Sequence, residues 1–226
     1  MPEQQLFDMS ERLPVEISRI AHPDDIHIFG GHYGDRTYYA DYCGIAAKFV
    51  PTSILEIGVR FGYSGIALTF GALQRFKPIG RQKIVYRGMD GEFFGCEFEG
   101  ADGYKLYRSN AVAARNFELF HGEVKLDARF YAVNTQVHEF PDEVTKHTYD
   151  LINVDGDHSF QGALKDCRNC WPLLNPGGLM LVDDMSFAEV GPAIYEFIKE
   201  RESAGETLIW QLHRNERDMM LIRRNQ

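Results

Sequence analysis

Two apolar stretches of this sequence end in acidic side chains. Residues 149–155, YDLINVD, end in Asp155, and residues 179–184, LMLVDD, end in Asp183 and Asp184. If these stretches are neighbouring parallel strands, three carboxylates converge at one sheet edge and repel one another unless something neutralises them. A divalent cation such as Mg²⁺ accepts oxygen ligands of this kind. Single aspartates also form turns and helix caps, but the doubled acid favours a metal site.

The residues that follow Asp155 suggest proton transfer and helix capping. His158 lies three residues further on, and an imidazole with an ordinary pKa of about 6.5 titrates near neutral pH. As a general base it would take the proton of a bound hydroxyl, whose pKa a nearby cation lowers. The alternative for His158 is a hydrogen bond to a backbone carbonyl at a helix start. Asp157 is predicted to cap the helix from Ser159.

A second chemical signal is the glycine-bearing run ILEIGVRFGYSG at residues 54–65. Its glycines, Gly58, Gly62 and Gly65, lie where a strand turns into a helix, and glycine lets a ligand approach the backbone closely. The spacing departs from the dinucleotide pattern GxGxxG, because Arg60 stands in place of the second glycine. This departure argues against NAD as the ligand.

The elements that position these residues alternate along the chain. Apolar patterns predict strands at 53–58, 83–90, 128–134, 149–155 and 179–184, and helices at 43–50, 63–76, 111–120, 159–174 and 190–205. Residues 207–214 and 217–224 predict a closing antiparallel hairpin. The pattern predicts an α/β protein with a doubly wound, mostly parallel, seven-stranded sheet. Ligands of such sheets bind at the carboxyl ends of the strands.

Composition limits the classes of function. The net charge is −9, from 33 acids against 24 lysines and arginines, which argues against nucleic acid and anionic membranes as partners. The N-terminus lacks a signal-peptide core and no stretch is long enough to span a bilayer, so a cytoplasmic protein is expected. The pair Cys167 and Cys170 lies within a predicted helix, which favours packed thiols over metal or redox use.

The run LEIGVRFGYS resembles the first motif of class I S-adenosylmethionine-dependent methyltransferases. The metal-dependent, catechol-type O-methyltransferases are most similar, and cephalosporin-hydroxylase-like and macrocin-type natural-product enzymes share the pattern over residues 50–190. The resemblance implies a Rossmann-like fold and one methyltransferase domain over 1–226. Residues 1–50 would form a helical and loop lid region, and 51–226 the core.

The resemblance also implies a cofactor site for S-adenosylmethionine. Its methionine part would lie over the glycine turn, with its carboxylate bonded by Ser64 at a helix N-terminus. Asp90 would hold the ribose hydroxyls, with a plain turn as the alternative role and Glu92 as the substitute. The adenine would meet the residues that end the next strand. The implied set is Glu56, Gly58, Gly62, Tyr63, Ser64, Asp90, Thr135, Gln136 and Asp155.

In the catechol-type family the metal ligands are an Asp ending the fourth strand and an Asp-Asn pair ending the fifth. Asp155 and Asp183 match these positions, and Asp184 stands where Asn is usual. The family's general base is a lysine three residues after the first metal ligand, and here that position is His158. The resemblance therefore implies Mg²⁺, or another divalent cation, beside a histidine base.

Two aromatic segments outside these motifs, within 22–42 and 92–108, suit a lid over a ring-bearing acceptor. Alternatively, their aromatic residues pack on the core or form a homodimer contact. Trp171 and Trp210 are expected in the core.

The function expected is S-adenosylmethionine-dependent, metal-assisted O-methylation of a small molecule, either a secondary metabolite, a phenol or a sugar. One alternative is a metal-independent methyltransferase that uses Asp155 and His158 as acid and base. The other is a binding subunit without catalytic activity.

Overall fold

The computed structural model describes residues 5–17, 37–75, 83–91, 98–100, 103–105, 109–122 and 126–225. The two predicted lid segments fall largely outside this part of the chain. Of the first, residues 22–36 are not described, and of the second, 92–97, 101–102 and 106–108 are not. The lid role of both segments therefore stays a prediction.

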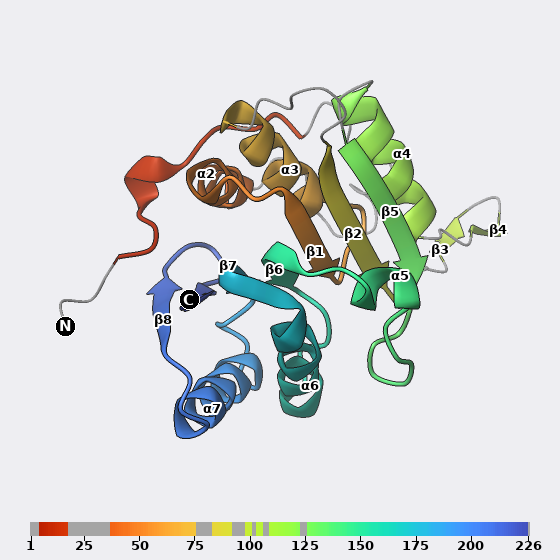
Figure 1. The fold of residues 1–226 in the computed structure, drawn as a ribbon. Coiled ribbons are helices and arrows are strands. Elements are labelled where there is room, and N and C mark those ends of the chain that lie inside the picture. Colours follow the sequence, from red (N-terminus) through yellow and green to blue (C-terminus); the bar gives the residue numbers. More distant parts are fainter. Residues whose placement is uncertain are drawn as a thin grey trace.

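A seven-stranded sheet forms the centre of the protein (Figure 1). Its spatial order is β5-β2-β1-β6-β7-β9-β8, in which β5, β2, β1, β6 and β7 run parallel and β9 is antiparallel to both neighbours. This arrangement confirms the predicted mostly parallel sheet with its C-terminal hairpin. The strands are β1 (Ser53–Ile57), β2 (Ile84–Asp90), β5 (Leu126–Ala132), β6 (Tyr149–Val154), β7 (Leu174–Val182), β8 (Leu208–His213) and β9 (Met219–Arg224).

Helices cover both faces of this sheet (Figure 1). One face carries α2 (Tyr39–Phe49), α3 (Tyr63–Arg75) and α4 (Ser109–His121), and the other carries α5 (Asp142–Thr145), α6 (Phe160–Cys170) and α7 (Val190–Ser203). Short 3₁₀ turns lie at Met9–Glu11 and Trp171–Leu173, and β3 (Phe98–Gly100) pairs with β4 (Gly103–Lys105) outside the main sheet. None of the described helices is long and apolar enough to cross a membrane.

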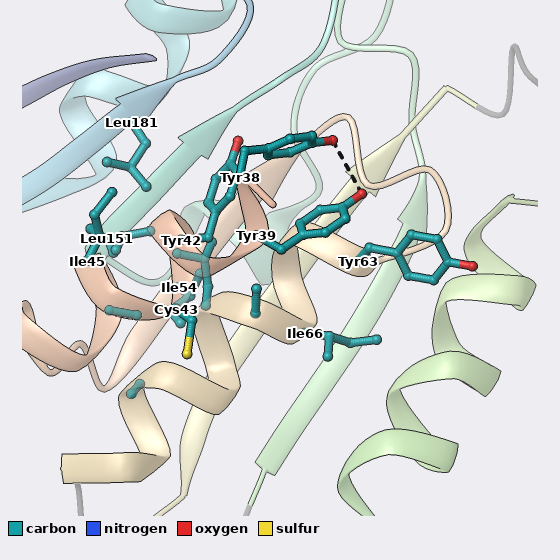
Figure 2. Close-up of a cluster of buried hydrophobic side chains, with 14 of the residues drawn as sticks. Tyr38, Tyr39, Tyr42, Cys43, Ile45, Ile54, Tyr63, Ile66, Leu151 and Leu181 are labelled. Carbon is teal, nitrogen blue, oxygen red and sulfur yellow. Dashed lines mark hydrogen bonds between the residues drawn. The ribbon is translucent and has the colours of Figure 1, made fainter. Parts of the chain in front are cut away.

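Two hydrophobic clusters lie on the two faces of the sheet. Each strand supplies side chains to both clusters, because side chains alternate between the two faces along a buried strand. In β1, Ile54 joins the cluster under α2 and α3, and its neighbour Leu55 joins the cluster under α6 and α7; both are fully buried. Figure 2 shows the first cluster, in which tyrosines of α2 pack beside Ile54 and Leu151. The strands therefore read as nearly continuous apolar runs in the sequence.

The described boundaries differ from the predicted ones where a local breaker was overlooked. The predicted helix 159–174 ends at Cys170, because Pro172 cannot continue an α-helix. Trp210 is 40% exposed, so its predicted place in the core was wrong, whereas Trp171 is 3% exposed. Trp210 lies on β8, which is an edge strand of the sheet among the described residues.

The sheet order places a topological switch point between β1 and β6. The chain proceeds from β1 outward to β2 and β5, and then returns to β6 on the other side of β1. Backbone hydrogen bonds continue past the strand ends: Asp155 N donates to Ile57 O at 2.9 Å, and Gly58 N donates to Met89 O at 2.9 Å. The residues that follow these strands are therefore held side by side, at the position where such sheets bind ligands.

Candidate active site

A cavity of about 510 Å³ lies over the carboxyl ends of β1, β2, β5, β6 and β7. Seven residues predicted from the sequence are on its wall: Gly58, Asp90, Thr135, Gln136, Asp155, His158 and Asp184. A smaller compartment of about 40 Å³ shares Gly58 and Asp155 with it and includes Tyr63 and Ser64. The structure thus brings together most of the predicted site from five separate strand ends.

Close contact with the neighbouring strand end requires glycine at position 58. Its φ is +84°, and a Cβ added there would lie 1.7 Å from the carbonyl oxygen of Asp155. Gly62 also has a positive φ, +79°, and Arg60 between them adopts +48°. The predicted turn is therefore shaped by backbone conformation, and Arg60 is tolerated where a dinucleotide motif has glycine.

Glu56 lies beneath this turn and is fully buried. Asn153 Nδ2 donates to its Oε1 at 2.9 Å, and the hydroxyls of Ser64 and Tyr86 also donate to it. Burial raises the Glu56 pKa from 4.5 to about 7, although the three hydrogen bonds oppose this rise. The hydroxyl of Ser64 donates its proton to Glu56 in this structure, and its predicted contact with a ligand carboxylate stays a prediction.

The opposite end of the cavity is built from the turns after β2 and β5. One oxygen of Asp90 accepts a hydrogen bond from Arg60 N at 2.7 Å, so the carboxylate is fixed against the glycine turn. Thr135 is buried, and Gln136 Nε2 lies 3.1 Å from Asp166 Oδ1 and 3.3 Å from Thr135 Oγ1. Sequence inspection missed Asp166, because a single acid within an amphipathic helix carries no local signal.

The acidic cluster forms where β6 and β7 end. His158 Nε2 lies 3.6 Å from Asp155 Oδ1 and 3.1 Å from Asp184 Oδ2. One ligand atom from each of these three side chains lies within 4.8 Å of the others, an arrangement able to hold a metal ion. Asp183 does not belong to that group of ligand atoms, so its role as a metal ligand stays a prediction.

Arg217, on the turn between β8 and β9, reaches this cluster and was not identified from the sequence. Its Nη1 lies 3.1 Å from Asp184 Oδ2 and 4.0 Å from Asp183 Oδ2. Its guanidinium lies over the ring of Tyr38, 5.3 Å from the centroid. The hydroxyl of Tyr38 bonds to that of Tyr39 (Figure 2). A basic residue 33 positions after Asp184 gives no local sign of this contact.

The local helix start differs from the predicted one. Ser159 is the N-cap of α6, and its hydroxyl oxygen accepts a hydrogen bond from Gly162 N at 3.1 Å. Asp157 accepts from Ser159 N at 2.7 Å, which forms the turn before the helix. The predicted capping role of Asp157 was therefore wrong. Ser159 caps α6, and Asp157 belongs to the turn that precedes the helix. His158 lies in this turn, and its ring packs on Phe187 with a centroid distance of 4.7 Å.

Burial and like charges dominate the electrostatics of the cluster. Desolvation, followed by the charges of Asp155 and Asp184, raises the pKa of Asp183 well above its ordinary value. Burial and Asp155 raise the Asp184 pKa to about 6. The hydrogen bond to Asp155 raises the pKa of His158 above 6.5. Burial and, after it, the neighbouring negative charges raise the pKa values of the two acids, and a bound cation would favour their ionised forms.

The residues present fit a divalent cation. Both carboxylate oxygens of Asp183 are buried, and neither has a hydrogen-bond partner in the described part of the chain. One oxygen of Asp184 is in the same condition. Buried carboxylate oxygens without donors are costly unless a cation compensates them, and carboxylates are the ligands that Mg²⁺ accepts.

The sheet order and the strand-end cavity define the class of protein as Rossmann-like α/β, with its ligand site at the switch point beside β1. Within that class, residues 55–185 match the family model described as a methyltransferase domain. Because this match covers more than half of the chain, the protein belongs to the methyltransferase family. No curated protein sequence matches the chain.

Solved structures share the fold at low sequence identity. An O-methyltransferase from Bacillus cereus in complex with SAH has a TM-score of 0.59 at 14% identity, over 94% of this chain and 93% of that one. TomG from Streptomyces achromogenes, in complex with SAM, has 0.58 at 15%, over 95% and 92%. SAH-bound PaMTH1 from Podospora anserina has 0.57 at 16%, over 95% and 90%. These similarities confirm the methyltransferase fold.

Proposed function

We propose that this protein transfers a methyl group from S-adenosylmethionine to a hydroxyl oxygen of a small molecule, with a divalent cation held at the acidic cluster. The observation that carries the proposal is the buried carboxylate of Asp183, which precedes Asp184 of the cavity wall and whose two oxygens have no hydrogen-bond partner among the described residues. Membership of the methyltransferase family supports the cofactor. The cavity of about 510 Å³ is of a size that suits small ligands.

The cofactor would lie across the switch point. The glycine turn would let its methionine part approach the backbone, and Asp90 would accept hydrogen bonds from the ribose hydroxyls. Because Ser64 donates to Glu56, the backbone N–H groups at the start of α3 are the better donors for the cofactor carboxylate. Thr135 and Gln136 would meet the base at the far end.

Asp155 and Asp184 would hold the cation, together with Asp183, which leaves His158 free to act as the base. When bound, the cation supplies charge that lowers the pKa of the acceptor hydroxyl. The chain's own residues do the remaining work. Phe187 packs on the imidazole of His158 and limits its motion, and Asp155 keeps its Nε2 directed at the cluster.

The reaction is a displacement at the methyl carbon. The acceptor oxygen forms a bond to that carbon as the carbon–sulfur bond breaks, and the electron pair returns to sulfur. The hydroxyl proton goes to the imidazole of His158, at the ring nitrogen that carries no proton in the neutral form. His158 can serve as base only in its neutral form, so the raised pKa of its imidazole must be offset in the loaded site. A bound cation beside Asp155 and Asp184 provides that offset.

A second candidate is methyl transfer without a metal, and the position of Arg217 favours it. Arg217 and His158 both contact Asp184, so protein cations already neutralise part of the cluster. In that case Asp155 and His158 would act as the acid–base pair. The two candidates differ in what removal of metal does to the activity.

The test combines calorimetry with a transfer assay. S-adenosylhomocysteine is titrated into the protein with and without Mg²⁺, and labelled S-adenosylmethionine is then supplied with a panel of phenols and sugars. Transfer that EDTA abolishes and Mg²⁺ restores supports the metal-assisted reaction, whereas transfer that survives EDTA supports the second candidate. Binding without any transfer would favour a subunit without catalytic activity, and lack of binding would refute the proposal.

A further inference from the structure

Asp166 is a fully buried carboxylate behind the cavity wall. It lies on α6, between the turn that follows β5 and the turn that follows β6. Its Oδ1 accepts a hydrogen bond from Gln136 Nε2 at 3.1 Å. A Cβ added to Gly156 would come within 2.7 Å of its Oδ2, so the backbone of the turn after β6 lies close to this oxygen. Asp166 therefore contacts two segments that line the cavity.

The turn that carries Gln136 is fixed from several directions. Its backbone N–H donates to Asn134 Oδ1 at 2.9 Å, and its carbonyl oxygen accepts from Lys165 Nζ at 2.7 Å. Its side-chain Nε2 contacts both Asp166 and Thr135. Neighbouring residues of α6, Lys165 and Asp166, thus hold the main chain and the side chain of Gln136.

This contact decides which end of the Gln136 amide a ligand can meet. An ionised carboxylate only accepts hydrogen bonds, and of the two ends of an amide only the NH₂ group donates. Asp166 therefore turns the NH₂ group of Gln136 towards α6. The amide oxygen is left as the polar group that Gln136, a residue of the cavity wall, can offer to a ligand.

We propose that Asp166 is a positioning residue that makes the site selective for a 6-aminopurine cofactor. By holding the NH₂ group of Gln136, it presents the amide oxygen as an acceptor to the exocyclic amine of the purine. A 6-oxopurine would place oxygen against oxygen at the same position. Such a mismatch leaves polar groups unpaired, which is how hydrogen-bonding sites reject close analogues. The inference rests on the proposed S-adenosylmethionine function.

The test compares two ligands by calorimetry: S-adenosylhomocysteine and S-inosylhomocysteine, which differ at position 6 of the purine. The wild-type protein is expected to bind the adenosyl compound about 10- to 100-fold more tightly. Asp166→Asn nearly preserves the side chain's shape but can offer Gln136 either an oxygen or an NH₂ group. Its preference is expected to fall to about threefold or less, because the amide of Gln136 is no longer held in one orientation.

Asp150→Asn is the matched control. Asp150 accepts hydrogen bonds from Thr52 N at 2.8 Å and from Asn175 Nδ2 at 2.8 Å. It lies near the amino-terminal ends of β1 and β6, at the other end of these strands from the cavity. It should lower thermal stability but leave the ligand preference at the wild-type value. Gln136→Leu, which leaves Asp166 in place, should lose the preference and provides a second variant with an intact α6.

Two results would overturn the inference: equal wild-type affinities for the two ligands, or an Asp166→Asn variant with the wild-type preference. A wild-type protein that binds neither ligand would overturn the proposed function as well. Because S-adenosylhomocysteine binding is measured first, failure of the function and failure of the selectivity mechanism are distinguished.

Discussion

Replacement of Glu56 by Gln is expected to stabilise the protein at alkaline pH. Glu56 is fully buried, and burial raises its pKa from 4.5 to about 7. Gln resembles the protonated acid in shape and charge, and it retains an oxygen that can accept from Asn153 and Ser64. The variant therefore removes the cost of ionising this site but preserves most of its hydrogen bonds.

The sign and size of the effect follow from proton linkage. Because the folded-state pKa is raised, Glu56 contributes stability that is fully present below pH 4.5 and is lost as the pH rises to about 7. At about 1.4 kcal/mol for each pH unit, the loss is about 3 kcal/mol. Glu56→Gln should match the wild type near pH 4.5 and exceed its unfolding free energy by up to about 3 kcal/mol at pH 8.

Urea unfolding of both proteins at several pH values between 4.5 and 8 measures this difference. Other buried acids, such as Asp184 with a pKa raised to about 6, change the stability of both proteins alike and cancel in the comparison. Glu118→Gln, at an exposed position on α4, controls for the loss of one negative charge. A constant difference between wild type and Glu56→Gln over this pH range would refute the reasoning.

Three further predictions follow from individual contacts. Gly58→Ala combines a positive φ of +84° with a clash against Asp155 O, so thermal unfolding should show a loss of about 2–5 kcal/mol; an unchanged stability would contradict the close contact. Trp171→Ala should cost about 3–5 kcal/mol in urea unfolding, whereas Trp210→Ala, at an exposed position, should cost about 1 kcal/mol or less; equal losses would be inconsistent with the described burial. His158→Ala should lower kcat by about 10²- to 10⁴-fold and leave S-adenosylhomocysteine affinity unchanged; a wild-type kcat would exclude the base role.

Much of the fold could be predicted because its signals are local. A buried parallel strand is an apolar run, and a strand-to-helix turn with close backbone contact needs glycine, as at Gly58 and Gly62. The boundaries that were wrong also have local causes. Pro172 ends α6 earlier than the apolar pattern suggested, and the four residues of α5 are too few to show helical periodicity.

The cavity-lining residues were found in the sequence where they end a strand or lie in the turn that follows it. Asp90 ends β2, and Asp155 and Asp184 lie within two residues of the ends of β6 and β7, so the parallel topology places all three at one edge. Arg217 comes from a hairpin turn and Asp166 from the interior of a helix. Neither residue has a neighbour in the sequence that marks it: Gln136, which donates to Asp166, and Asp184, which pairs with Arg217, each lie 30 or more positions away.

The sequence alone determined that the acids at the ends of β2, β6 and β7 meet at the carboxyl edge of the sheet, since each strand carries its terminal residues to that edge. Only the tertiary structure decided how the charges are paired. It placed Arg217 and His158 on Asp184, and it left both oxygens of Asp183 buried without a hydrogen-bond partner in the described part of the chain. It also bonded Ser64 to Glu56. The physical reason is that side-chain pairing depends on distances of a few ångströms across elements, which no local pattern in the sequence encodes.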